Sequence, residues 1–370
     1  MVKRCSLYFH IPFCSRKCPY CHFYVVPNTP SFHRVLEEGL FLEWESRLSL
    51  LEDKEITSIY FGGGTPSLFA PGGIEKILQK IRESKIELTP SCEITIEANP
   101  EEESQEFFEK LLSLGINRLS IGVQSLDDRS LQTLERTHSA KKAKSAIFSA
   151  HKAGFKNISI DLMYDLPDQT ESSWQYTLSE ISSLPIQHLS LYNLTIEPHT
   201  SFYKRRKTLS LPDPKTSLRF LECAVRTMED IGLTRYEISA FAKKGFSSQH
   251  NLGYWTGKPF LGFGPSAFSF WEGERFRNIA NLQRYTRELK QSKSPIDFKE
   301  KLPFPQNLKE LFSVRLRLLE GADVDPKFPQ EMQDAISRLI ENNFLIKNGS
   351  RVCLTEKGIL FHDTVASEIM

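Results

Sequence analysis

Six stretches of the chain have the apolar or alternating pattern of β-strands, and amphipathic helical patterns lie between them. The predicted strands are residues 6–13, 56–64, 92–100, 117–125, 157–167 and 188–198. A typical helical segment is residues 139–154, where Gly154 stands at the expected helix end. Repeated β–α units predict a parallel sheet wound in the right-handed sense. Six units in place of eight predict an α/β fold with an open, partial (β/α)6 barrel.

Polar or unusual residues stand at the C-terminal end of every predicted strand, where β/α folds place their chemistry. The first strand runs into a group of cysteines, and the second ends in the glycine run 62–64. The other four carry Glu97, Gln124, Asp161 and Asn193. An unpaired polar group inside an apolar strand is costly, so these side chains need partners. The pattern therefore predicts a ligand site along one rim of the sheet.

Three cysteines, Cys14, Cys18 and Cys21, follow the first strand with C-x3-C-x2-C spacing. Zinc usually takes a fourth ligand from a second Cys or His pair, and only His10 and His22 are near. A [4Fe–4S] cluster also normally has four thiolates, so three leave one iron open for a small molecule. This spacing is typical of radical S-adenosylmethionine (SAM) proteins, in which SAM fills that position. A zinc knuckle and chance clustering are the alternatives.

The charge balance and the other cysteines narrow the class of protein. The 370 residues contain 47 Lys and Arg against 46 Asp and Glu, which argues against a general nucleic-acid binder. Since no apolar run approaches the roughly 18 to 20 residues of a membrane span, and no signal cleavage site follows the N-terminus, we expect a cytoplasmic protein. Seven cysteines without a secretion signal argue against a disulfide framework. The isolated ones are expected to be small buried hydrophobes: Cys5, Cys92, Cys223 and Cys353.

Several segments together resemble the oxygen-independent coproporphyrinogen-oxidase-like radical-SAM family, and they fit best its haem-chaperone branch. In chain order they are LYFHIPFCSRKCPYCHF, YFGGGTPSL, ITIEANP, LSIGVQS, ISIDLMYDLP, LYNLTIEP, RYEISAFA and HNLGYW. The resemblance implies that the cysteine triplet ligates a [4Fe–4S] cluster and that SAM and haem also bind. It further implies three kinds of partner: haem or porphyrin, a haem-acceptor protein, and a reductant such as flavodoxin or ferredoxin.

The resemblance also assigns residues to the cofactor site. Those that would line the SAM site are Tyr8, Gly63, Glu97 and Asn193. Those that match positions holding a second SAM in the enzyme relatives are Tyr20, Gly64, Thr65, Gln124, Arg136 and Asp161. Chemistry alone permits these roles, because glycine allows close backbone approach and arginine pairs with carboxylates.

Departures from the family pattern bear on the activity. The decarboxylases of the family carry a fourth cysteine two residues after the third, where this chain has Phe23, and a longer N-terminal extension. We therefore expect haem trafficking without coproporphyrinogen dehydrogenase activity. The alternative is oxidative decarboxylation of coproporphyrinogen III to protoporphyrinogen IX. His22 replaces the usual Asp, while Asp165 and Asp168 replace glycines.

Three domains are expected from the change of pattern along the chain. Residues 1–210 form the radical-SAM partial barrel, residues 211–300 an α+β extension, and residues 301–370 a small winged-helix-like module. The extension holds an HNxxY segment, in which His250 and Tyr254 would share one face of a helix. Both side chains can ligate haem iron, and a buried hydrogen-bonded pair is the alternative. Residues 308–370 have eight basic and ten acidic residues, which argues against a phosphate-binding face.

Overall fold

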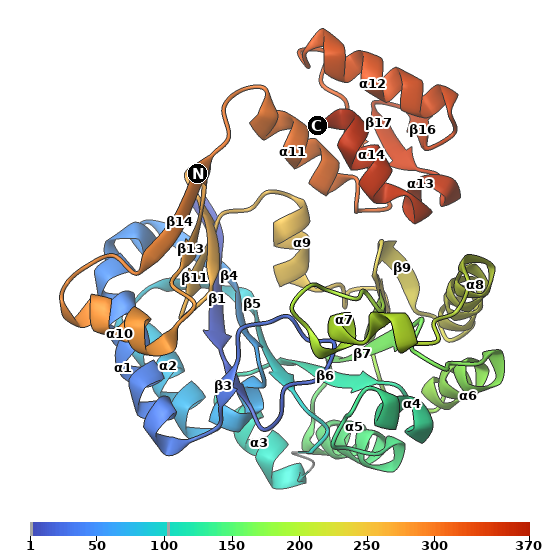
Figure 1. Ribbon diagram of the computed structural model, residues 1–370. Helices are drawn as coiled ribbons and strands as arrows, with labels where there is room; N and C mark the ends of the chain where they lie inside the picture. Colours follow the sequence, from blue (N-terminus) through green and yellow to red (C-terminus); the bar gives the residue numbers. More distant parts are fainter. Residues whose placement is uncertain (1–2, 102–103) are drawn as a thin grey trace.

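The computed structural model describes residues 3–101 and 104–370, and its centre is one 12-stranded mixed sheet (Figure 1). Six consecutive parallel strands form the middle of this sheet, in the order of the chain. They are β1 (Lys3–Ile11), β4 (Lys54–Gly63), β5 (Glu87–Ala98), β6 (Arg118–Gln124), β7 (Ile158–Tyr164) and β8 (His188–Asn193). The six predicted strands and the α/β class are therefore confirmed.

The segment predicted as an α+β extension adds strands to both sides of these six. On one side, β11 (Phe260–Phe263) pairs in parallel with β1. It is followed by the antiparallel strands β12 (Phe268–Trp271), β13 (Glu274–Asn278) and β14 (Ile296–Lys301). On the other side, β10 (Ala240–Ala242) pairs antiparallel with β8, and β9 (Thr234–Glu237) pairs antiparallel with β10 at the edge of the sheet. The sheet is thus mixed, with β1 in its interior.

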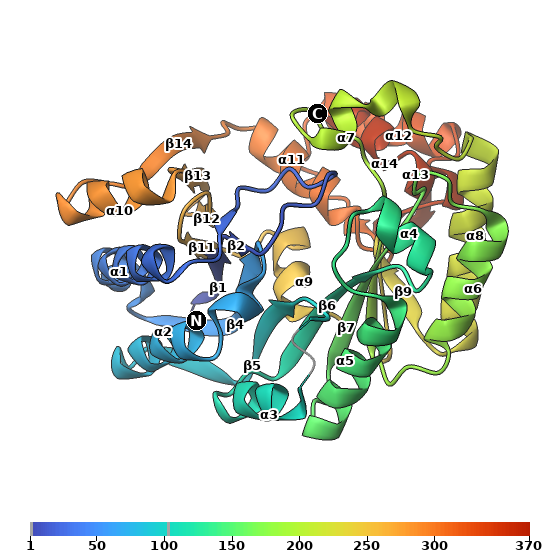
Figure 2. The ribbon, with the colours of Figure 1, turned by 60° about the horizontal axis from the view of Figure 1, so that its bottom comes forward.

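Helices follow the outside of the curved sheet (Figure 2). The main ones are α1 (Pro30–Arg47), α2 (Gly72–Glu83), α3 (Gln105–Ser113), α4 (Asp128–Thr133), α5 (Ala140–Ala153), α6 (Glu171–Ile181), α8 (Pro214–Asp230) and α10 (Leu282–Lys290). Many begin at a polar N-cap that accepts a backbone hydrogen bond, as Ser139 does from Lys142 and Thr170 from Ser173. The stop predicted at Gly154 is confirmed, since this residue caps α5 with a φ of 111°.

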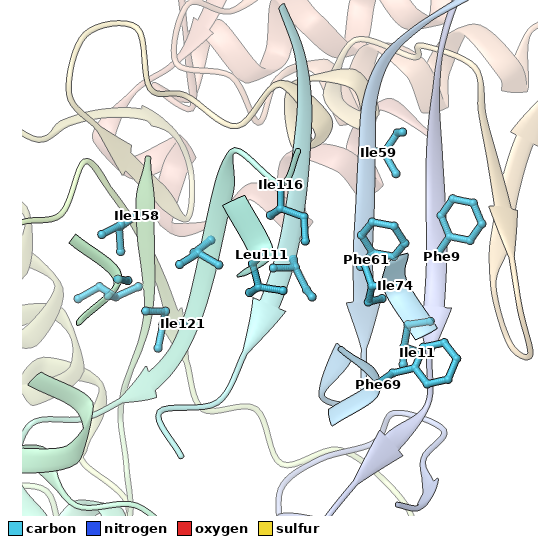
Figure 3. Packing of buried hydrophobic residues seen from close by; sticks show 14 of the residues in the cluster. Phe9, Ile11, Ile59, Phe61, Phe69, Ile74, Leu111, Ile116, Ile121 and Ile158 are labelled. Atoms are coloured by element: carbon cyan, nitrogen blue, oxygen red, sulfur yellow. The ribbon is translucent and has the colours of Figure 1, made fainter. Parts of the chain in front are cut away.

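Successive side chains of each strand point to opposite faces of the sheet, one toward the hydrophobic core and one toward the site. Phe9 and Ile11 on β1 and Phe61 on β4 are buried, and Figure 3 shows them packing with Ile74 of α2. The ring centroids of Phe9 and Phe61 lie 5.3 Å apart. Alternate residues point to the opposite face of a strand, so Tyr8 and its neighbours face the inside of the curved sheet. The hydrophobic core therefore lies under the helices, and polar side chains gather inside the curve.

The C-terminal region forms a smaller body with its own core. Its elements are α11 (Gln306–Arg315), β15 (Ala322–Asp323), α12 (Gln330–Glu341), β16 (Leu345–Asn348), β17 (Arg351–Leu354), α13 (Glu356–Leu360) and α14 (His362–Ile369). The strands make a three-stranded sheet, and Met332 and Leu339 lie in the separate core. Backbone hydrogen bonds join this body to the region around β9, as from Leu319 to the carbonyl of Tyr236 (3.1 Å). No helix in residues 3–101 and 104–370 has both the length and the apolar character to cross a membrane.

Candidate cofactor-binding site

A cavity of about 470 Å³ opens at the carboxyl ends of the parallel strands. Most of the residues predicted from the sequence line it: Cys14, Cys18, Tyr20, Cys21, Gly63, Gly64, Thr65, Glu97, Gln124, Arg136, Asp161 and Asn193. Each of the six parallel strands delivers at least one of these residues, on the strand itself or in the loop that follows it. The rim predicted from the strand ends thus forms a single concave site.

The cysteine loop forms one wall of this cavity. It follows β2 (Phe13–Cys14), which pairs with β3 (Val26–Pro27), and the amide of Cys21 donates to the carbonyl of Cys18 (3.1 Å). All three thiols are free and half-buried. Burial raises the pKa of the Cys14 and Cys21 thiols, so iron would have to displace their protons on binding.

Three free thiols at one cavity match the requirement of a [4Fe–4S] cluster, in which each thiolate binds a different iron. Within the described residues, no three His, Cys, Asp or Glu side chains converge closely enough to hold a metal ion. Arg136 places a guanidinium nitrogen 3.4 Å from the sulfur of Cys18, and such a cation stabilises a thiolate. The donor set therefore fits the cluster.

The glycine run comes against the cysteine loop, and two of its positions require glycine. Gly63 has a φ of 114°, and a Cβ atom there would lie 2.6 Å from the ring of His10. A Cβ atom on Gly64 would lie 2.5 Å from the carbonyl oxygen of Phe13. The amide of Thr65 donates to that same carbonyl (2.7 Å). The absence of side chains lets β4 and the cysteine loop approach each other at the cavity.

Arg136 contacts both the cysteine loop and residues at the ends of β5 and β6. Its guanidinium donates to Asn99 Oδ1 (2.9 Å) and to the carbonyl of Gly122 (3.0 Å). Its Nε atom is buried and has no hydrogen-bond partner. Asn99 was not predicted from the sequence; it lines the cavity and donates to Thr65 Oγ1 (3.3 Å). Its position two residues after Glu97 was the available signal, because alternate residues of an extended chain share a side.

Two carboxylates, Glu97 and Asp161, lie inside the curve of the sheet. Glu97 accepts hydrogen bonds from the hydroxyl of Tyr60 (2.8 Å) and the amide of Gly63 (3.1 Å). Burial and the nearby charge of Asp161 raise the pKa of Glu97 to about 7. Burial also raises the pKa of Asp161, whose Oδ1 accepts from Ser120 (3.3 Å). Both groups can accept hydrogen bonds from a cationic or hydroxyl-bearing ligand.

Gln124, Asp165 and Asp168 have left-handed backbone conformations. Gln124, which lines the cavity, has a φ of 65°, an unfavourable value that indicates local strain. Asp165 and Asp168 have φ values of 61° and 60°. Glycine would adopt this conformation without strain, and Asp is among the residues that tolerate it best.

Tyr8 is the predicted SAM-site residue that does not line the cavity. Its hydroxyl lies 3.1 Å from His10 Nδ1, and its ring stacks on Tyr60 at a centroid distance of 6.2 Å. A Cβ atom on Gly62 would lie 3.1 Å from the Tyr8 ring, so Tyr8 packs beside the first glycine of the run. Tyr192, just before Asn193, lines the cavity with 47% of its surface exposed. This aromatic side chain was not predicted from the sequence.

The HNxxY segment forms the short helix α9 (Gln249–Trp255), away from the cysteine cavity. His250 Nε2 lies 2.8 Å from the hydroxyl of Tyr254, and His250 Nδ1 lies 3.0 Å from Ser58 Oγ. His250 and Tyr254 do share one face, and they form a hydrogen-bonded pair in which His250 is buried and Tyr254 half-buried. Burial lowers the pKa of His250 to about 3, so the ring is neutral at pH 7. The carboxylate of Glu93 accepts from the amide of His250 (3.1 Å) at the start of α9.

A second cavity, of about 400 Å³, lies between α9, the strands β12–β14 and α11. Its apolar lining includes Trp255, Phe260, Phe270, Leu302, Leu308 and Leu311. Tyr254 lines it together with the basic residues Lys258, Arg275 and Lys301. Two carboxylates of the lining, Glu300 and Glu310, are both paired with Arg275. Tyr254 therefore contacts His250 on one side and the second cavity on the other. The wall of this cavity is mainly apolar and includes charged side chains.

Comparison with known proteins agrees with this geometry. The model of the radical SAM superfamily matches residues 8–181. The protein named haem chaperone HemW of Lactococcus lactis is 32% identical over 375 residues, which cover 99% of this chain and 97% of that protein. HemW of Haemophilus influenzae is 35% identical over 374 residues, covering 96% and 95% of the two chains.

Among solved structures, coproporphyrinogen III oxidase (HemN) from Escherichia coli superposes with a TM-score of 0.86 at 22% identity. The match covers 100% of this chain and 91% of the oxidase. At this identity the likeness establishes the fold, a radical SAM fold of the HemN type. The two HemW proteins match nearly the full length of the chain at more than 30% identity. The chain therefore belongs to the HemW family of radical SAM proteins.

Proposed function

We propose that this chain is a haem-trafficking protein that binds a [4Fe–4S] cluster, SAM and haem and passes haem to an acceptor protein. The observation that carries the cofactor part is the single cavity that joins Cys14, Cys18 and Cys21 to polar side chains from the parallel strands. The names of the full-length relatives support the haem part.

The residues around the cysteine loop suit the polar groups of SAM. Glu97 would accept hydrogen bonds from its amino group or its ribose hydroxyls. The backbone at Gly63 and Gly64 leaves room for close approach, and the unpartnered Nε of Arg136 is a donor for its carboxylate. The cluster supplies the open iron position at which SAM binds and the electron that SAM chemistry requires.

Haem would occupy the second cavity, beside α9. A porphyrin needs apolar walls for its ring and cations for its two propionates. The lining supplies the apolar walls, and Lys258 and Lys301 are cations for which no ion pair with a described residue is found. Tyr254 faces the cavity and His250 stands behind it, so these two side chains are the proposed iron ligands. Ligation by the imidazole requires its bond to the tyrosine hydroxyl to open.

The cofactor part is tested by anaerobic reconstitution of the purified chain with iron and sulfide. We expect about four iron atoms per chain and visible absorption of a thiolate-bound cluster. Replacement of Cys14, Cys18 and Cys21 by Ala should abolish both signals. The matched control replaces the half-buried Cys223 and Cys353 by Ala and should retain them. A cluster that survives the triple replacement would contradict the proposal.

Oxidative decarboxylation of coproporphyrinogen III is the second candidate. It is favoured by Gln124, Arg136 and Asp161, which match second-SAM positions in the enzyme relatives and all line the cavity. Phe23, which stands in place of the fourth cysteine and is 52% exposed, opposes it. The reconstituted chain is incubated anaerobically with SAM, a reductant and coproporphyrinogen III. Formation of protoporphyrinogen IX would favour the enzymatic function over haem trafficking.

A further inference from the structure

Four consecutive basic residues, 204–207, are exposed beside the cysteine loop. They lie at the end of α7 (Ser201–Lys204) and in the following turn (Arg206–Thr208). The amide of Phe202 donates to the carbonyl of Pro19 (2.9 Å), and the rings of Tyr20 and Phe202 pack with centroids 6.2 Å apart. Figures 1 and 2 both show the loop next to α7. The basic run is therefore fastened to the loop that carries the three thiols.

The cysteine loop adds two exposed cations, Arg16 and Lys17. We call the six residues 16, 17 and 204–207 the basic rim. Glu135 neutralises part of it through ion pairs with Arg16 (2.5 Å) and Arg205 (2.9 Å), and Glu197 lies nearby on the cavity wall. Lys204 and Lys207 have no ion pair with any described residue. Because the whole chain has a formal net charge of only +1, this excess is local.

An exposed aromatic residue lies at the loop end of the basic rim. Phe23 follows the third cysteine, is 52% exposed, and its carbonyl accepts from the ammonium group of Lys17 (2.9 Å). Aromatic side chains of this kind are frequent anchors of protein interfaces. A cationic surface with one apolar anchor, placed against a redox centre, is suited to a small interface that is steered by charge.

We infer that the basic rim docks a small acidic protein that carries one electron and reduces the cluster. The inference rests on the proposed function, because it requires a cluster at Cys14, Cys18 and Cys21. One electron passes from the reduced carrier to the cluster; the carrier is oxidised, the cluster is reduced, and no atom is transferred. The rim lies directly on the cysteine loop, which gives the shortest path for that electron. A protein carrier explains this position better than a nucleic acid, which has no need to lie near the thiols.

The test compares charge-reversed variants, with a reduced, acidic [2Fe–2S] ferredoxin as the probe. The variant K204E/K207E changes two rim lysines that no ion pair holds. The control K152E/K156E makes the same charge change at the end of α5 and the start of β7, on the opposite edge of the sheet. Ferredoxin affinity is measured by titration, and cluster reduction is followed by rapid mixing.

At low ionic strength we expect K204E/K207E to lower both the affinity and the second-order rate by about tenfold, with the control close to wild type. High salt should shrink the difference. Methyl viologen radical, a small cation, should reduce both variants at least as fast as wild type, which verifies an intact cluster.

Equal ferredoxin affinity and rate in wild type and K204E/K207E would overturn the inference. Duplex DNA that binds more tightly than ferredoxin through the same lysines would overturn the choice of partner. Failure to assemble a cluster contradicts the proposed function instead, while ferredoxin affinity still reports on the rim.

Discussion

His250 Nε2 lies 2.8 Å from the hydroxyl oxygen of Tyr254, so the two proposed haem ligands are hydrogen-bonded to each other. A single hydrogen bond contributes only about 0.5 to 1.5 kcal/mol net, which haem ligation can readily replace. We expect His250→Ala to weaken haem binding by about tenfold or more, and Tyr254→Phe to shift the Soret band. A haem titration monitored by absorption measures both.

A second His–Tyr pair in the same fold is the control for the haem experiment. His188 Nε2 lies 2.9 Å from the hydroxyl of Tyr236, and this pair does not border the second cavity. Tyr236→Phe should leave haem affinity and the Soret band unchanged. If His250→Ala and Tyr254→Phe behave in the same way as Tyr236→Phe, the HNxxY segment is structural.

Gly63 should be intolerant of any side chain. In Gly63→Ala the new Cβ atom would lie 2.6 Å from the His10 ring, on a backbone with a φ of 114°. We expect a loss of about 2 kcal/mol or more in the free energy of unfolding, together with weaker SAM binding. Chemical denaturation and a SAM titration measure the two effects. The control is Gly72→Ala, where nothing lies within 4 Å of the added atom; an equal loss there would contradict the argument.

The buried carboxyl of Glu97 should make the stability of the apoprotein depend on pH. Its pKa is raised from 4.5 to about 7, so between these values the folded state holds a proton that the unfolded state has lost. The free energy of unfolding should therefore fall as the pH rises through this window. Denaturation at several pH values should show a smaller slope for Glu97→Gln, with part remaining because burial also raises the pKa of Asp161. The exposed Glu106→Gln is the control, and an unchanged slope for Glu97→Gln would refute the assignment.

A buried ion pair within α1 is hydrogen-bonded to the chain that follows β11. Glu43 and Arg47 lie 2.9 Å apart, and Glu43 also accepts from Tyr285 (2.5 Å), Asn278 (2.7 Å) and the amide of Gly264 (2.8 Å). Removing one partner leaves a buried charge, so Glu43→Ala should cost about 3 to 5 kcal/mol.

Two comparisons check this prediction about Glu43. The double variant Glu43→Leu/Arg47→Met should cost less than the sum of its single replacements, measured by a double-mutant cycle. Glu37→Ala breaks the exposed ion pair with Lys76 (2.8 Å) and should cost less than about 1 kcal/mol. Equal losses at the buried and the exposed pair would show that burial is not the cause.

Asp168 offers a test of whether its left-handed backbone governs this position. It is exposed, has a φ of 60°, and its amide donates to the carbonyl of Ser210 (2.8 Å). Asp168→Gly should change the free energy of unfolding by less than about 0.5 kcal/mol, whereas Asp168→Ala should lower it by about 1 kcal/mol. Chemical denaturation separates them, and equal effects would mean that backbone conformation does not govern this position.

The sequence predicts the parallel core and its rim because both depend on local patterns. Each of the six strands is apolar and ends in a polar group, and parallel strands bring those ends to the same edge. The strand β11 was not predicted, since it has only four residues and its pairing with β1 joins segments far apart in the chain. The hydrogen-bonded pair of His250 and Tyr254 was one of the two alternatives from the sequence, but the second partner of His250 was not predicted, because Ser58 lies on the distant strand β4. Local periodicity fixes which residues share a face, but it does not reveal distant partners.

The interior position of β1 has a consequence for how the protein is made. One side of β1 pairs with β4, whereas the other side pairs with residues 260–263 of β11, which are synthesised much later. During synthesis on the ribosome, the strand that leads into the cysteine loop therefore keeps an open edge until more than two thirds of the chain has emerged. Exposed strand edges invite pairing with other chains. A fragment cut after residue 210 would retain the three cysteines but expose that edge, so we expect it to aggregate where the full chain does not.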